Sequence, residues 1–118
     1  MLFCVDIGNT NIVLGVWDGD ELRHHWRIAT DNLKMPDEYA VLILALFAQH
    51  GVRLTDVGGA ILASVVPPLT GVFQEVIEGA FGLSPLVVDA GVKTGVRVRT
   101  DNPREVGADL VVDAAAAY

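Results

Sequence analysis

Two clusters of turn-forming residues divide the first thirty residues of the chain into three apolar runs. The clusters are Asp6-Ile7-Gly8-Asn9-Thr10-Asn11 and Asp18-Gly19-Asp20. The runs beside them cover residues 2–5, 12–17 and 22–29. Short apolar runs separated by Gly, Asn and Asp are typical of strands joined by tight turns. An antiparallel β-meander is therefore predicted at the start of the chain.

The following residues alternate between helical and strand patterns. A helix is expected from Pro36 to a stop at Gly51, because Pro suits the first helical position and Gly closes helices. Apolar residues at intervals of three and four predict a second helix over 69–81, ended by Gly82. The remaining expected elements are strands at 57–66 and 86–88, a loop at 91–95, an edge strand at 96–99 and a last helix over 102–118. This order predicts an α/β fold with a mixed sheet.

Composition excludes several classes of function. The chain has 118 residues, 52% of them hydrophobic, and a formal charge of −7, which predicts one small globular domain. The acidic balance argues against nucleic-acid binding. No apolar stretch reaches the ~18 residues that indicate a membrane span, and no signal peptide is expected. A single cysteine, Cys4, fits a reducing cytoplasm, so a cytoplasmic location is expected.

The first turn cluster has the chemistry of a phosphate site. Asp6 ends an apolar run, and Gly8 allows a ligand to approach the backbone closely. The turn offers backbone N–H groups, amides and a hydroxyl to a phosphate chain, and the carboxylate suits Mg²⁺. Phosphoryl transfer needs these groups. The same residues also suit an ordinary hairpin in which they serve turn geometry alone, and the pattern leaves both interpretations open.

Several motifs resemble one known family, in the same order along the chain. The pattern Asp-x-Gly-x-Thr resembles the first phosphate motif of the acetate and sugar kinase, Hsp70 and actin superfamily. The longer string from Asp6 to Asn11 is similar to the N-terminus of type III pantothenate kinases. Further matches are Arg27, Thr30 and Asp37-Glu38-Tyr39, then Ser64-Val65-Val66-Pro67-Pro68-Leu69, then Lys93-Thr94-Gly95, and Asn102-Pro103 with Glu105 and Gly107-Ala108-Asp109.

The resemblance implies a ribonuclease H-like (actin-like ATPase) domain, with a mixed sheet that starts from the meander and is flanked by helices. It implies ATP-dependent phosphorylation of the primary hydroxyl of pantothenate, the first step of coenzyme A biosynthesis, with Mg²⁺, a monovalent cation (K⁺ or NH₄⁺) and a homodimer. The implied ATP phosphate loop is Asp6, Ile7, Gly8, Asn9, Thr10, Asn11, Ile12 and Val13, with Asp6 also near the metal. The implied substrate residues are Thr100, Gly107, Ala108, Asp109 and Leu110, with Asp109 as the general base.

The chain departs from the family pattern in three residues and in length. Leu110 stands where Arg is common, Thr100 where Tyr is frequent, and Asp113 where Asn is common, which weakens expectations about substrate detail. Family members are considerably longer. The resemblance therefore implies an N-terminal domain over residues 1–118 with its last helix truncated, no second domain in this chain, and no activity of the chain alone.

Two other functions stay open at this stage. Members of the family have also been described as accessory transcription factors of the Baf type, although the acidic charge argues against direct DNA contact. A kinase of the same fold that acts on another small hydroxyl substrate is the second alternative, favoured by Leu110 and Thr100.

Overall fold

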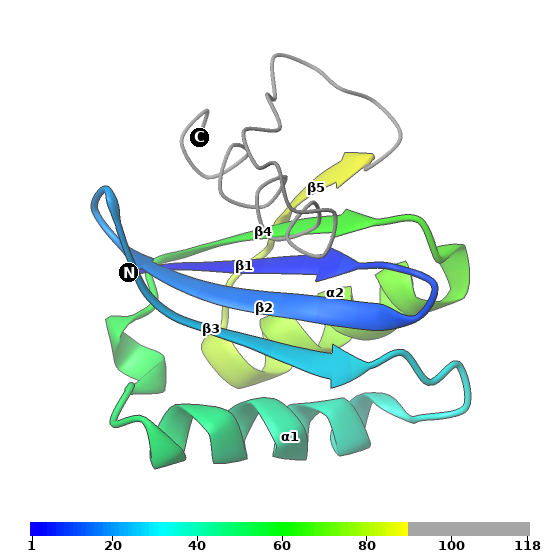
Figure 1. Ribbon diagram of the computed structural model, residues 1–118, viewed down its shortest axis with the longest axis horizontal. Helices are drawn as coiled ribbons and strands as arrows, with labels where there is room; N and C mark the ends of the chain where they lie inside the picture. Colours follow the sequence, from blue (N-terminus) through cyan, green and yellow to red (C-terminus); the bar gives the residue numbers. More distant parts are fainter. Residues whose placement is uncertain (90–118) are drawn as a thin grey trace.

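A computed structural model describes residues 1–89. Within them the chain forms five strands, two α-helices and a short 3₁₀ helix (Figure 1). The elements are β1 (Leu2–Ile7), β2 (Asn11–Asp18), β3 (Glu21–Ala29), α1 (Pro36–Gln49), η1 (Leu54–Asp56), β4 (Gly59–Ser64), α2 (Pro67–Phe81) and β5 (Leu86–Asp89). The expectations for 91–95, 96–99 and 102–118 lie outside the described residues.

The five strands form one mixed sheet in the order β3-β2-β1-β4-β5. β1, β2 and β3 pair antiparallel, whereas β4 pairs parallel with both β1 and β5. The predicted meander and the mixed sheet are thus confirmed. Because β1, β3, β4 and β5 run in the same direction, their carboxyl ends meet at one edge of the sheet (Figure 1).

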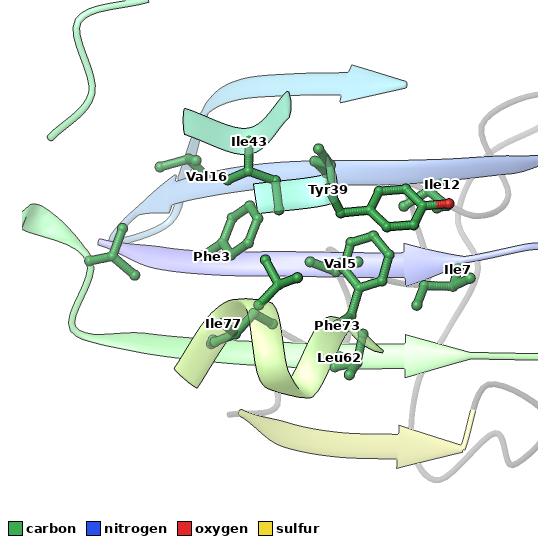
Figure 2. Packing of buried hydrophobic residues seen from close by; sticks show 14 of the residues in the cluster. Phe3, Val5, Ile7, Ile12, Val16, Tyr39, Ile43, Leu62, Phe73 and Ile77 are labelled. Atoms are coloured by element: carbon green, nitrogen blue, oxygen red, sulfur yellow. The ribbon is translucent and has the colours of Figure 1, made fainter. Parts of the chain in front are cut away.

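One face of the sheet carries the main hydrophobic core. Side chains from β1, β2 and β4 alternate toward α1 and α2 and are buried against them (Figure 2). Phe3 packs edge-on against Phe47 of α1, with ring centroids 5.4 Å apart, and Tyr39 of α1 packs against Phe73 of α2 at 4.6 Å. These aromatic contacts hold both helices to the same face.

The second face of the sheet has a smaller apolar cluster. Cys4 and Ile61 are fully or almost fully buried there, and Leu2, Trp17 and Val88 pack against them. All five residues belong to strands, so within residues 1–89 this face has no helix packed against the cluster. Strand alternation places Asp6 on the same face, because it lies two residues after Cys4.

Most predicted boundaries agree with the structure. β1 continues through Asp6 and Ile7, which were predicted to lie in the turn, and the other main differences occur around β4. The expected strand over 57–66 is shorter at both ends and covers Gly59–Ser64. At its end the Ser64 hydroxyl accepts a hydrogen bond from the Val66 N–H and donates one to the Val66 carbonyl. Pro67 and Pro68 begin α2 two residues before the predicted start at Leu69. Proline suits this position because the first helical N–H groups have no partner within the helix.

The predicted helix endings are confirmed. α1 runs from Pro36 to Gln49, and Gly51 follows with a positive φ of 72°. Gly82 caps α2 in the left-handed conformation, at φ 68°. Within residues 1–89 no helix combines the length and the hydropathy needed to cross a membrane.

Candidate functional site

Asp6 is a buried carboxyl at the carboxyl end of the central strand. It pairs with Val13 on β2 and with Ala63 on β4, and only 7% of its surface is exposed. Burial raises its pKa from 3.8 to about 6, and no hydrogen bond from residues 1–89 offsets that effect. A buried carboxylate without donors is costly unless a cation neutralises it. The position therefore suits a metal ligand.

The turn between β1 and β2 is fixed from within and from β3. The Gly8 N–H donates to the Asn11 carbonyl at 2.9 Å, which closes the turn. The Thr30 hydroxyl donates to the Gly8 carbonyl at 2.7 Å, and the Thr30 N–H donates to the Thr10 carbonyl at 3.0 Å. The residue after β3 thus holds both ends of the turn. Such a rigid turn is suited to bind a phosphate chain with little reorganisation.

Glycine is favoured at position 8 because the turn brings the Asn11 carbonyl oxygen close to this residue. A Cβ at this position would lie 3.0 Å from the Asn11 carbonyl oxygen, closer than ordinary van der Waals contact. The polar side chains of Asn9, Thr10 and Asn11 are exposed at the same edge. Asn11 Nδ2 donates to Thr10 Oγ1 at 3.3 Å. The turn therefore presents amide and hydroxyl groups outward while its backbone stays fixed.

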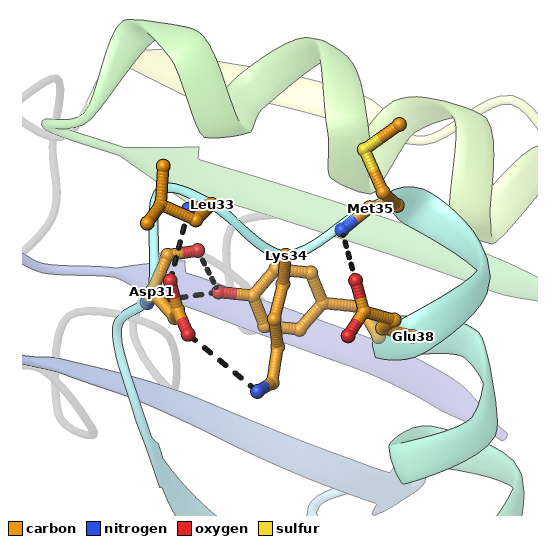
Figure 3. A network of polar contacts seen from close by, with 6 residues as sticks. Asp31, Leu33, Lys34, Met35 and Glu38 are labelled. Carbon is orange, nitrogen blue, oxygen red and sulfur yellow. Dashed lines mark hydrogen bonds and ion pairs between the residues drawn. The ribbon is translucent and has the colours of Figure 1, made fainter.

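The loop that carries Thr30 is anchored to α1 (Figure 3). The Tyr39 hydroxyl donates to the Asp31 carbonyl at 2.8 Å and accepts from the Asp31 N–H at 3.0 Å. The Asp31 carboxylate accepts from the Leu33 N–H and pairs with Lys34 at 3.6 Å. Glu38 accepts from the Met35 N–H at 2.9 Å. Thr30 is thereby positioned by a helix on the core face of the sheet.

The carboxyl ends of β4 and β5 border the same edge. The Val65 N–H donates to the Ile7 carbonyl at 3.0 Å, which fixes the exit from β4 beside the exit from β1. Next to it lies a hollow of about 480 Å³, formed where β4 and β5 end and α2 begins. Its lining residues are Ser64, Pro67, Thr70, Val87 and Val88. In open α/β sheets, ligands bind in the crevice outside the carboxyl ends of the strands.

The structure brings the predicted phosphate-loop residues to one edge of the sheet, where residues 9–11 are exposed and the residues of the flanking strands are buried. Asp6 and Val13 lie side by side on the second face, and residues 8–11 form the turn. The side chains of Ile7 and Ile12 are fully buried in the main core, and both residues pair with neighbouring strands, so they support the turn from within the sheet. Thr100, Gly107, Ala108, Asp109 and Leu110 lie outside the described residues.

Sequence reasoning did not assign Thr30 to the site. It appeared only as part of a resembling motif, without a role. A usable signal was present, because a hydroxyl residue directly after the third strand of a meander lies at the same edge as the first turn. The contacts with Gly8 and Thr10 depend on the register of β2 and β3, which the local sequence does not determine.

The sheet order and the site at its carboxyl edge define an actin-like ATPase, or ribonuclease H-like, fold. The crystal structure of the ROK hexokinase from Thermus thermophilus is similar, with a TM-score of 0.55 at 20% sequence identity. The match covers 75% of this chain and 34% of the hexokinase chain. This similarity confirms the predicted fold class.

Within that class the chain belongs to the type III pantothenate kinase family, whose model matches residues 2–118. It is 52% identical over 118 residues to the type III pantothenate kinase of Geobacter sulfurreducens, covering 100% of this chain and 46% of that protein. Identity to the Geobacillus kaustophilus kinase is 50% over 116 residues, 98% of this chain and 45% of the relative. The chain thus spans about half the length of the relatives that it matches.

Proposed function

We propose that this chain is the N-terminal domain of an ATP-dependent kinase that phosphorylates the primary hydroxyl of pantothenate, the first reaction of coenzyme A biosynthesis. The observation that carries the proposal is Asp6, a buried carboxyl without hydrogen bonds from residues 1–89, beside a turn fixed by Thr30. Its position within the family's first phosphate motif and the membership of the chain in that family support the same activity.

The proposed chemistry is positioning and charge neutralisation. The N–H groups of Asn9 and Thr10 and the polar side chains of residues 9–11 bind the phosphates of ATP, while the Gly8 N–H closes the turn. Asp6 would hold Mg²⁺, an ion that commonly uses one or two carboxylates together with phosphate oxygens, and the ion would neutralise charge on the transferred phosphate. Family membership also supports a monovalent cation, K⁺ or NH₄⁺, a cytoplasmic location and a homodimer.

The proposed acceptor site belongs to the part of the chain beyond residue 89. Asp109 accepts the proton of the pantothenate hydroxyl as it attacks the γ-phosphorus, and Thr100, Gly107, Ala108 and Leu110 hold the substrate. We also propose that the part of the relatives' length that this chain does not span supplies the rest of the cleft. The chain alone is then expected to be inactive, because much of the cleft that orients the reactants is missing.

The test is Asp109→Asn in the full-length protein, in which this chain is followed by the second half present in its relatives. We expect phosphorylation of pantothenate to fall by a factor of about 10² or more, while ATP still binds. Asp101→Asn, outside the residues that match the family motifs, is the matched control and should retain activity. Turnover of Asp109→Asn near that of the wild type would remove Asp109 from the mechanism.

A kinase of the same fold with another substrate is a second candidate, favoured by Leu110 and Thr100 in place of the common Arg and Tyr. A panel of small hydroxyl compounds supplied with ATP separates the two. Phosphorylation of another member of the panel, with none of pantothenate, would favour the second candidate.

A further inference from the structure

Arg27 lies in the same cross-strand row as Asp6. Asp6 pairs with Val13 across β1 and β2, and Val13 pairs with Arg27 across β2 and β3. Directly paired residues project from the same face of a sheet, so all three lie on the second face. Alternation along β3 agrees with this placement, because Trp26 and Ile28, the neighbours of Arg27, pack against the core on the helix-covered face.

The two charged ends of the row are separated by one strand. Adjacent strands are about 4.8 Å apart, so the backbones of Asp6 and Arg27 are separated by roughly 10 Å. Val13 between them is short and apolar. The long side chain of Arg27 can extend across the width of one strand toward Asp6.

The other cationic side chains of residues 1–89 are placed elsewhere. Arg23 pairs with Asp18 at 3.5 Å and with Glu21 at 4.0 Å, and Lys34 pairs with Asp31. Arg53 precedes η1 and β4, at the sheet edge opposite the phosphate turn. Arg27 has an interaction of its own within the chain, and its candidacy rests on its position in the row.

A guanidinium at this position has the right chemistry for a phosphate chain. The side chain of Arg27 is exposed, although the two row members beside it, Val13 and Asp6, are buried. Arginine is always charged, and its planar group can bind two phosphate oxygens at once. ATP carries several negative charges, and the chain has a formal charge of −7, so its binding requires local positive charge.

We propose that Arg27 is a nucleotide-binding residue whose guanidinium contacts the β- and γ-phosphates of ATP from the β3 side of the sheet. This inference rests on the proposed kinase function and adds a contact from a strand outside the phosphate motif. It assigns the third strand of the meander a role in recognising the phosphate chain, in addition to its structural role.

The test compares Arg27→Met and Arg27→Lys with the matched control Arg53→Met, all in the full-length protein. Calorimetric titration with ATP, ADP and AMP, each in the presence of Mg²⁺, measures how affinity depends on the terminal phosphates. We expect Arg27→Met to weaken ATP binding about tenfold or more, to weaken ADP less, and to leave AMP unchanged. Arg27→Lys should restore part of the loss, and Arg53→Met should bind as the wild type does.

Steady-state kinetics separates this inference from the function on which it rests. Arg27→Met should raise the KM for ATP and leave the KM for pantothenate unchanged, whatever its effect on the melting temperature. Equal loss of ATP and AMP affinity, or a change confined to the KM for pantothenate, would overturn the assignment of Arg27. A wild-type protein that binds ATP but does not phosphorylate pantothenate would instead refute the proposed function, while the ATP titrations would still decide the role of Arg27.

Discussion

At the scale of single residues, Asp6 is in an unfavourable environment for a carboxylate. Its pKa is raised to about 6 by burial, so at neutral pH the folded chain holds a charge that water would solvate better. Its neighbours Val13 and Ala63 are apolar and provide no donors. Natural proteins tolerate such a cost where the group has a function, which is consistent with a proposed role in holding a cation.

The unfavourable burial of the Asp6 carboxylate predicts how the stability of the protein depends on pH. Because the pKa of Asp6 is higher in the folded state than its ordinary 3.8, the folded state is least penalised below pH 4 and loses stability as pH rises through about 6. Asp6→Asn should therefore stabilise the metal-free protein at pH 7 by about 2 to 3 kcal/mol, and by much less at pH 4. Urea unfolding at both pH values measures this difference.

The matched control for Asp6→Asn is Asp18→Asn. Asp18 lies on the same sheet in an exposed ion pair with Arg23, so its substitution should change stability by less than about 1 kcal/mol. The explanation by desolvation would be wrong if Asp6→Asn destabilised the protein at pH 7.

At the scale of secondary-structure elements, the site depends on a connection between α1 and the meander. Tyr39 is fully buried, and its hydroxyl makes two hydrogen bonds with the backbone of Asp31. Asp31 follows Thr30, which in turn bonds to the carbonyls of Gly8 and Thr10. The geometry of the phosphate turn is thus transmitted from a helix on the opposite face of the sheet.

Tyr39→Phe tests this connection. The substitution keeps the ring packed against Phe73 but leaves the N–H and the carbonyl of Asp31 without their partner. We expect a loss of about 1 to 3 kcal/mol in the free energy of unfolding and weaker ATP binding in the full-length protein. Lys34→Ala, which removes an exposed ion pair in the same loop, should have a much smaller effect. Unchanged stability and ATP affinity in Tyr39→Phe would contradict the proposed connection.

Local signals in the sequence predicted the elements well, and long-range contacts were the part that they could not provide. The turn formers after β1 and β2, Pro36 and Gly82 each mark a boundary through the conformation of one or two residues. The start of α2 was predicted too late, because the prediction followed the spacing of apolar residues, and that spacing does not include Pro67 and Pro68 in the first turn.

In the candidate site, too, local motifs could be predicted from the sequence and long-range contacts could not. Asp6 and Gly8 could be identified because their motif is contiguous in the sequence. Thr30 and Arg27 reach the same edge only through the pairing registers of β2 and β3, and the parallel pairing of β1 with β4 joins residues far apart in the chain. No local pattern encodes those registers. The implied role of Asp109 as the general base stays a prediction.

At the scale of the whole molecule, β1 is the structural centre. It has a strand on each side, the main core on one face and the Cys4 cluster on the other. The thiol of Cys4 is fully buried, and burial raises its pKa to about 12. Its reactivity therefore reports whether the centre of the sheet has opened.

Thiol labelling of Cys4 should consequently be blocked in the native protein at pH 8. We expect modification by a small alkylating reagent, followed by mass spectrometry of the peptide that contains Cys4, only at the rate of global unfolding. The control is Cys4→Ala combined with Thr55→Cys, which places a thiol at an exposed position of η1 and should label at once. Rapid labelling of Cys4 far below the unfolding midpoint would show that β1 opens independently.

The pairing of β1 with β4 also matters while the protein is being made. Synthesis proceeds from the N-terminus, so the hairpins of β1, β2 and β3 leave the exit tunnel of the ribosome before α1, η1 and β4 do. During that interval the β4 side of β1 is an unpaired, strongly apolar border that another nascent polypeptide can join. The emergence of Ser64 from the exit tunnel closes this period of exposure, and a pause in translation before that residue would extend it.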